Sequence, residues 1–150
     1  MKINVIVLGK MKGFARMAVE EYKKMLSQFV DVELIELGHD NVENESTLKK
    51  DAMKVLRILK NDDYVVLLDE RGVSYDSVSF AHHLWDLLVR NGKIIFIVGG
   101  PFGVDQNLKK RANELVSLSS MTLTHRLATI VLLEQLFRSF KILNNQRYHY

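Results

Sequence analysis

The sequence predicts an α/β protein with a mostly parallel β-sheet and helices on both faces. Strand-like apolar runs alternate with helical stripes along the chain, which is the pattern of successive β–α–β units. The 150 residues suffice for one core, and their 47% hydrophobic and 26% charged content is that of an ordinary globular protein. The chain has no internal repeat and no linker rich in proline, glycine or serine, so we expect a single domain over residues 1–150.

The first third of the chain supplies two expected strands and two expected helices. Ile3–Leu8 is a continuous apolar run, typical of a strand that is buried on both faces. Phe14–Gln28 carries apolar residues at helical spacing, and Val32–Leu37 alternates as a half-buried strand does. Gly38–Glu45 is expected to be a loop, and Ser46 is a candidate N-cap for the helix that follows it.

The middle of the chain predicts a third strand and a third helix. Tyr64–Leu68 is apolar and is expected to end in the polar turn Asp69–Gly72. Either Ser77 or Ser79 is a candidate N-cap for the next helix, which Asn91-Gly92 would close.

The last third predicts two more strands, a short helix and a long one. Lys93–Val98 and Leu115–Leu118 are the expected strands, and Gln106–Asn113 is the short helix between them. Leu127–Leu143 is the final helix, and it is apolar nearly all round. A terminal helix without a polar face is difficult to bury in a domain of this size, so we expect half of it to be core and half to be a homodimer interface.

Composition excludes several classes of chemistry. The chain has no cysteine, so disulfides, thiolate nucleophiles and cysteine-bound zinc are absent, and a cytoplasmic location is expected. No apolar run approaches the roughly 18 residues that span a bilayer, so no membrane association is expected. Because Lys10 and Lys12 follow the first apolar run at once, we interpret that run as a strand and not as a signal sequence. The pair His82-His83 has no ligand spacing around it, so we expect solvated or capping histidines and no metal.

Charge is distributed unevenly along the sequence. The last fifty residues hold seven basic and three acidic side chains, whereas the first hundred are nearly neutral. This asymmetry indicates either a polyanion-facing surface at the C-terminal end or a solvated basic face without a partner.

Two loops at the carboxyl edge of the predicted sheet are candidates for a ligand site. In open parallel sheets, ligands bind beyond the carboxyl ends of the strands. Gly99–Gly103 has three glycines and the sole proline in five residues, and Ser117–Thr122 has small side chains, so both loops expose backbone groups that can recognise an adenine edge. Neither the phosphate-loop motif nor G-x-G-x-x-G is present. On spacing alone, the glycines fit a tight turn as well as a ligand site.

Four segments together resemble one enzyme family. They are Ile94–Gly103, Leu115–His125, Leu133–Ile142 and Tyr148-His149. In this combination the chain resembles the RlmH family, the large-subunit rRNA pseudouridine N3-methyltransferases of the SPOUT superfamily. The resemblance covers the whole length and is most specific in the last fifty residues.

The resemblance implies a C-terminal trefoil knot and a bound cofactor, S-adenosylmethionine, held by the backbone of the knot loops. The matching cofactor positions are Leu68, Gly99, Leu118, Ser119, Ser120, Met121, Thr122 and Leu123. It also implies a homodimer in which the partner's C-terminal tail completes each site. The implied substrate is N3 of a pseudouridine in 23S large-subunit rRNA, either free or in the assembled ribosome.

Four residues are the candidates for catalysis within this resemblance. We expect Arg138 and His149, with Tyr148, to position or activate the target base, and His125 to support the cofactor loop or the RNA. His125 as a plain hydrogen-bonding loop residue and the tail as a substrate grip are the alternatives.

Two departures from the family pattern leave rival functions open. Thr124 stands where the family usually has proline, and Thr129 where it commonly has arginine. A non-catalytic RNA- or ribosome-binding module that kept the knotted fold is therefore one alternative. A flavodoxin-like nucleotide or signalling domain that uses Asp69 is a weaker one.

Overall fold

A computed structural model of the chain describes residues 1–38, 44–100 and 103–149. Strands and helices alternate along it, as the sequence predicts. In chain order they are β1 (Lys2–Leu8), α1 (Phe14–Leu26), β2 (Asp31–Leu37), α2 (Glu45–Ile58), β3 (Val65–Ser74), α3 (Ser77–Asn91), β4 (Lys93–Val98), α4 (Gln106–Arg111), β5 (Glu114–Ser117) and α5 (His125–Leu143).

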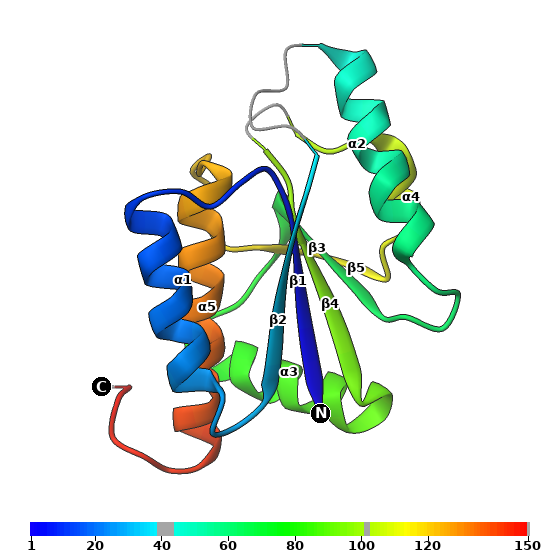
Figure 1. Cartoon of the computed structure of the whole chain (residues 1–150). Coiled ribbons are helices and arrows are strands. Elements are labelled where there is room, and N and C mark those ends of the chain that lie inside the picture. The colour runs from blue at the N-terminus through cyan, green and yellow to red at the C-terminus, as the bar shows by residue number, and fades with distance from the viewer. Residues whose placement is uncertain (39–43, 101–102, 150) are drawn as a thin grey trace.

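The described strands form one parallel sheet in the order β2-β1-β4-β3-β5. Helices α1, α3 and α5 cover one face, and α2 and α4 cover the other (Figure 1). The expected α/β fold class is therefore confirmed. Among the described residues, no helix is both long enough and apolar enough to cross a bilayer.

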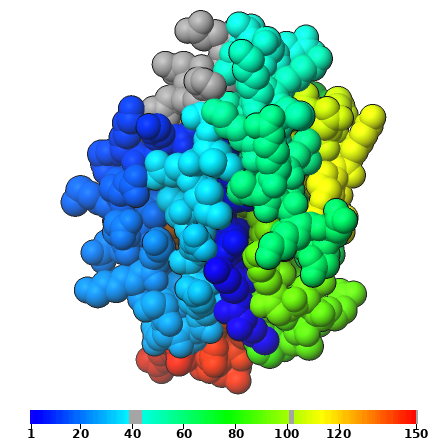
Figure 2. All heavy atoms as spheres, turned by 45° about the vertical axis from the view of Figure 1, so that its right-hand side comes forward, coloured from blue at the N-terminus to red at the C-terminus, as the bar shows by residue number. Residues whose placement is uncertain are grey.

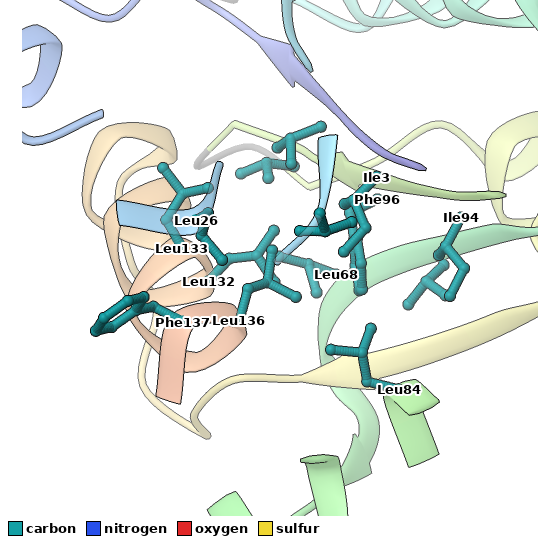
Figure 3. Packing of buried hydrophobic residues seen from close by; sticks show 14 of the residues in the cluster. Ile3, Leu26, Leu68, Leu84, Ile94, Phe96, Leu132, Leu133, Leu136 and Phe137 are labelled. Carbon is teal, nitrogen blue, oxygen red and sulfur yellow. The ribbon is translucent and has the colours of Figure 1, made fainter. Parts of the chain in front are cut away.

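The continuous apolar runs are explained by this three-layer arrangement. Successive side chains of a strand point to opposite faces, so a strand covered on both sides must be apolar at nearly every position. In β4, Ile94 and Phe96 belong to the core under α1, α3 and α5, whereas Ile95 and Ile97 belong to the core under α2 and α4. Helix α5 packs into the first of these cores. From α5, this core receives Leu132, Leu133, Leu136 and Phe137, which Figure 3 shows together with side chains of the sheet.

The helix caps differ from the predicted ones. Asn44, and not Ser46, caps α2, because its Oδ1 accepts a hydrogen bond from Thr47 N at 2.9 Å. Asp76, and not Ser77 or Ser79, caps α3, because its Oδ1 accepts from Ser79 N at 2.7 Å. In both helices the capping residue lies one to three positions before the predicted one, where an Asx side chain reaches the free N–H groups of the first turn. The expected loop at 39–43 lies outside the described residues.

Strand β3 does not end in the predicted polar turn but continues through Asp69–Gly72 to Ser74. Its pairing with β5 shifts register, since both Leu68 and Val73 lie opposite Val116. Gly72 makes the close approach of the two backbones possible: a Cβ there would lie 2.5 Å from Leu115 C. The residues that resemble a turn in the sequence are thus a β-bulge that reaches over β5.

Candidate functional site

A cavity of about 400 Å³ opens at the carboxyl ends of β3 and β4. Leu68 ends the buried part of β3, Gly99 follows β4, and the loop after β5 closes the third side. Seven of the eight residues predicted to hold the cofactor line it: Leu68, Gly99, Leu118, Ser119, Met121, Thr122 and Leu123. Ser120 is not among the lining residues and is exposed. The structure thus brings together residues from three segments that are up to 55 positions apart in the sequence.

Short side chains hold the loop after β5 in shape. Ser117 Oγ donates to Ser119 O at 3.0 Å, and Ser119 Oγ accepts from Met121 N at 3.0 Å. Thr122 Oγ1 donates to Glu70 Oε2 at 2.8 Å, which ties the loop to the extension of β3. Because these bonds use hydroxyl groups, the loop needs no bulky side chains for its conformation and can bring its backbone close to a ligand.

Of the described glycines after β4, Gly99 is the one whose surroundings leave no room for a side chain. A Cβ at Gly99 would lie 2.7 Å from Val104 Cγ2, whereas a Cβ at Gly100 would meet only Leu8 O, at 4.0 Å. Gly103 closes the turn with its N–H on Gly100 O at 3.2 Å, at a φ of 87°. Pro101 and Phe102, which belong to the same predicted loop, lie outside the described residues.

Charged groups from β3 and α4 line the rim of the cavity. Lys109 Nζ lies 3.6 Å from Asp69 Oδ2, and Asp69 Oδ1 accepts a hydrogen bond from Arg71 N at 2.9 Å. The lining thus holds two acidic residues, Asp69 and Glu70, and two basic ones, Arg71 and Lys109, and its other members are glycines, small residues and aliphatic residues.

A cluster of side chains centred on Glu134, here called the tail cluster, holds the C-terminal tail. Glu134 Oε2 accepts hydrogen bonds from Tyr148 OH at 2.6 Å and from Tyr22 OH at 3.2 Å. Its Oε1 accepts from Arg138 Nε at 2.9 Å and from Arg138 Nη2 at 2.7 Å. The Tyr148 ring also lies under the Arg138 guanidinium, 4.7 Å from its Cζ, and edge-on to Phe137. Residues of α1, α5 and the tail thus converge on one carboxylate.

The cluster keeps its tyrosines protonated. The hydrogen bond to Glu134, together with burial, raises the pKa of Tyr148 to about 12. Burial, followed by the negative charge of Glu134, also raises the pKa of Tyr22. Near neutral pH both phenols are therefore hydrogen-bond donors and not bases.

Arg138 also determines which ring nitrogen of His149 is the hydrogen-bond acceptor. Its Nη1 lies 3.2 Å from His149 Nδ1 and 3.4 Å from Tyr148 O. Because a guanidinium only donates, His149 Nδ1 is the acceptor, and the ring proton of the neutral imidazole is on Nε2. His149 lines a second cavity of about 480 Å³, between the start of α3 and α5, which shares Leu118 with the first.

Within one chain, the tail and the first cavity lie at opposite ends of α5. Arg138 is 13 residues beyond the start of this helix, which corresponds to about 20 Å along its axis. The tail lies below α1 and α5, at the end of the sheet where the strands begin (Figure 1), and at the lower edge in Figure 2. Neither Arg138, Tyr148 nor His149 lines the first cavity. The structure thus brings three of the predicted catalytic residues together, but not at the cavity of their own chain.

His125, the fourth predicted catalytic residue, neither lines the first cavity nor belongs to the tail cluster. It is 6% exposed, and its Nε2 donates a hydrogen bond to Lys10 O at 3.0 Å. The ring fills the space beside Gly9, where a Cβ would lie 2.7 Å from Nε2. Its visible role is to hold the β1–α1 connection against the start of α5.

The adjacent histidines of α3 have different environments. His82 is exposed, as expected, but His83 Nε2 lies 2.6 Å from Glu114 Oε1 and its ring stacks on Tyr75. His83 is therefore neither solvated nor capping. Among the described residues, no group of three or more histidine, aspartate or glutamate side chains is arranged to hold a metal ion.

Two members of the tail cluster are not among the site residues that the sequence predicts. They are Glu134, which accepts hydrogen bonds from Arg138 and Tyr148, and Tyr22, which also donates to Glu134. Tyr22 is separated from Glu134 by 112 positions, so no local pattern connects them. The signal that was available is a tyrosine on the apolar stripe of α1, which is a polar group that needs a partner once it is packed against a neighbour.

Comparison with known proteins identifies the class. A family model described as predicted SPOUT methyltransferase matches residues 1–149, and the chain belongs to this family. The chain is 54% identical to the ribosomal RNA large subunit methyltransferase H of Pseudothermotoga lettingae, with 100% of both chains covered. It is 41% identical to the protein of the same name from Thermosipho melanesiensis, again over 100% of both, and 40% identical to that of Ruminiclostridium cellulolyticum, over 99% of both.

Proposed function

We propose that the chain is an S-adenosylmethionine-dependent methyltransferase that acts on N3 of a pseudouridine in 23S large-subunit rRNA, in the cytoplasm. One observation carries the proposal: β3, the segment after β4 and the loop after β5 meet in a cavity lined by glycines, small polar residues and aliphatic residues. The names of the relatives support the rRNA substrate. We further propose that residues 1–150 form one SPOUT-type domain with the C-terminal trefoil knot of the superfamily.

The cavity suits the cofactor in size and chemistry. Small-molecule sites span roughly 300–1,000 Å³, and this cavity has about 400 Å³. Backbone at Gly99 and in Leu118–Leu123 would hold the adenosine, with Leu68 as an apolar wall. S-adenosylmethionine supplies an activated methyl group on a sulfonium, so the transfer requires neither a metal nor a covalent enzyme intermediate.

The tail residues are suited to binding and polarising the base. Pseudouridine N3 carries a proton at neutral pH, so nearby positive charge or hydrogen-bond donors stabilise the anion that forms when the proton leaves. Arg138 supplies a permanent positive charge, and His149 offers an Nε2–H donor beside it. Tyr148, which stays protonated, holds the tail to Glu134 and is not the base.

We propose that the active site forms between two copies of the chain. Because the cavity and the tail lie at opposite ends of α5, the tail of one subunit would serve the cavity of the other. The partly uncovered apolar side of α5, where Leu127 is 43% exposed and Ile130 and Val131 are half-buried, supports a homodimer interface on this helix.

The two departures from the family pattern have local roles at the start of α5. Thr124 caps the helix, with Oγ1 accepting from Leu127 N at 3.3 Å. Thr129 is buried and donates to His125 O at 2.7 Å. Since neither lines the cavity, we place the enzyme ahead of the non-catalytic RNA-binding alternative. Asp69, the residue of the flavodoxin-like alternative, pairs with Lys109 at the rim.

The test is mass spectrometry of large-subunit rRNA from cells with and without the protein, combined with methylation of isolated ribosomes and free rRNA. We expect one N3-methylated pseudouridine that disappears with the gene. Removal of Tyr148–Tyr150 should abolish methylation while the affinity for S-adenosylmethionine, measured by calorimetry, stays within about twofold. Identical rRNA from both strains, or full turnover by the truncated protein, would contradict the proposal.

A further inference from the structure

Beyond its first turn, where Glu45 is exposed, the solvent-facing side of α2 carries positive charge only. Lys49, Lys50, Lys54 and Arg57 are exposed there, while Ala52 and Val55 on the opposite side of the helix are buried. Among the described residues, none of these four cations has an ion-pair or hydrogen-bond partner. All four positive charges are therefore directed to solvent.

This pattern differs from that of an ordinary solvated helix. In α1, Arg16 is paired with Glu36 and lies 3.9 Å from Glu20, so the exposed charges alternate in sign. In α2, Lys50 and Lys54 are neighbours at i,i+4, and Lys54 and Arg57 at i,i+3. Like charges at these spacings destabilise an isolated helix, so the arrangement is unfavourable unless an anion lies against it.

Further cations lie on α4, the helix that contacts α2. Figure 2 shows α2 beside α4, and the two helices are in contact. On α4, Lys110 is exposed, and Arg111 donates to the carbonyls of Lys60 and Asp63, which fixes α4 against the connection between α2 and β3. Lys109, one residue earlier, lines the cavity rim. We call Lys49, Lys50, Lys54, Arg57 and Lys110 the basic face.

The distribution of cations in the fold also revises the sequence-based expectation. The seven basic residues of the last fifty do not form one surface, because Lys109, Lys110 and Arg111 belong to α4, whereas Arg138 and Lys141 contact Glu134 and Gln146 on the other side of the sheet. On the side of the sheet that α2 and α4 cover, the cations therefore come from these two helices, and α2 lies outside the basic C-terminal third.

We propose that the basic face binds the phosphate backbone of the rRNA that flanks the target nucleotide. This inference rests on the proposed function, which places an RNA base at the cavity. Unpaired Lys and Arg side chains on a rigid helix suit phosphates, whose binding releases counterions and does not depend on base sequence. A membrane fits less well, because the apolar side of α2 is buried in the protein core.

The experiment measures ribosome methylation by the full-length protein at several salt concentrations, with the double variant Lys50→Gln and Lys54→Gln. We expect KM for the ribosomal substrate to rise about tenfold at physiological salt and the salt dependence of log KM to fall by about one to two units of slope, because two phosphate contacts are lost. The turnover number and the calorimetric affinity for S-adenosylmethionine should not change. Lys50→Arg with Lys54→Arg should retain the wild-type KM.

The matched control is Lys24→Gln with Arg90→Gln, which removes the same charge from exposed positions on α1 and α3. This control should leave KM and its salt dependence unchanged. An unchanged KM in the α2 variant, or an equal rise in the control, would overturn the inference even if the enzyme methylates rRNA. If the wild-type protein does not methylate rRNA, the proposed function fails. Filter binding of large subunits then tests the basic face separately, and equal retention of wild type and α2 variant overturns it.

Discussion

Glu134 and Tyr148 are joined by a 2.6 Å hydrogen bond, which fastens the C-terminal tail to the middle of α5. The same carboxylate oxygen accepts from Tyr22, and the other accepts twice from Arg138. One side chain thus contributes strongly to the conformation of the tail, and its partners come from α1, α5 and the tail itself. This dependence makes the tail cluster testable with single substitutions.

Glu134→Gln should reduce the turnover number by roughly 10- to 100-fold, because an amide cannot accept from both tyrosines and Arg138, and small displacements of positioning groups are costly to catalysis. The affinity for S-adenosylmethionine, measured by calorimetry, should remain unchanged, since Glu134 does not line the cavity. Glu20→Gln is the control, because Glu20 is exposed and its nearest cation is Arg16 at 3.9 Å. A variant with normal turnover would show that the tail is positioned by other contacts.

The tyrosine titration of the protein should report the same hydrogen bond. The folded pKa of Tyr148, about 12, is raised above the ordinary value of 10.0, so the bond stabilises the fold below pH 10 and its contribution is lost as pH rises through about 12. In Glu134→Gln, absorbance at 295 nm should show a phenol that titrates closer to pH 10. Tyr64, which donates to Glu114, provides the internal control and should keep its pKa of about 12. Identical titration curves for the wild type and Glu134→Gln would show that this hydrogen bond does not raise the pKa of Tyr148.

Gly99→Ala should weaken cofactor binding, by about tenfold, because the new Cβ would lie 2.7 Å from Val104 Cγ2 and must displace the cavity wall. The double variant Gly99→Ala, Val104→Ala removes the colliding methyl group and should recover most of the affinity. Calorimetry on the two single variants and the double variant measures the coupling. If the double variant binds as weakly as Gly99→Ala alone, the Cβ obstructs the ligand directly and the wall is not the cause.

Two inactive chains should complement each other if the site forms between subunits. One chain lacks Tyr148–Tyr150, and the other carries Gly99→Trp, which fills the cavity. Each is expected to be inactive alone, whereas a mixed dimer contains one intact site of two and should have roughly half of wild-type activity. The check is methylation by co-expressed chains that are purified through different tags. Mixtures of separately inactive chains that stay inactive, despite confirmed mixed dimers, would place cavity and tail in the same subunit.

Gly72→Ala should lower the free energy of unfolding by about 1–3 kcal/mol, because the added methyl group would lie 2.5 Å from the backbone of Leu115 and push β5 away from β3. Ser74→Ala, an exposed position two residues later in the same strand, is the control and should change stability by less than about 0.5 kcal/mol. Urea denaturation of both variants gives the comparison. An unchanged free energy of unfolding in Gly72→Ala would mean that the backbone around residue 72 accommodates the methyl group without cost.

Local patterns were sufficient for the fold class and for most elements, because burial on two faces imposes continuous apolar runs such as Ile94–Val98 and because Gly92 is a recognisable C-cap with φ of 71°. They failed where a distant segment decides the structure. Asp69–Gly72 resembles a turn, yet β3 continues through it and pairs with β5 again from Val73.

The functional residues divide in the same way. The glycines after β4 and the small residues after β5 were identifiable because each group follows an expected strand, and the structure places most of them around one cavity. The partnership of Tyr22 with Glu134 and the extension of cations from α2 onto α4 depend on tertiary packing, so no periodicity within a single element reveals them.

Helix α5 sets both the distance and the rotation between the loop that ends at Thr124 and the tail cluster at Glu134 and Arg138. Inserting a single residue between them would turn the tail by about 100° around the helix axis and separate Glu134 from Tyr22. An insertion of three or four residues, about one helical turn, would return Glu134 to its original side of the helix but would lengthen the helix by about 5 Å. The stretch from Thr124 to Arg138 should therefore tolerate no change in length.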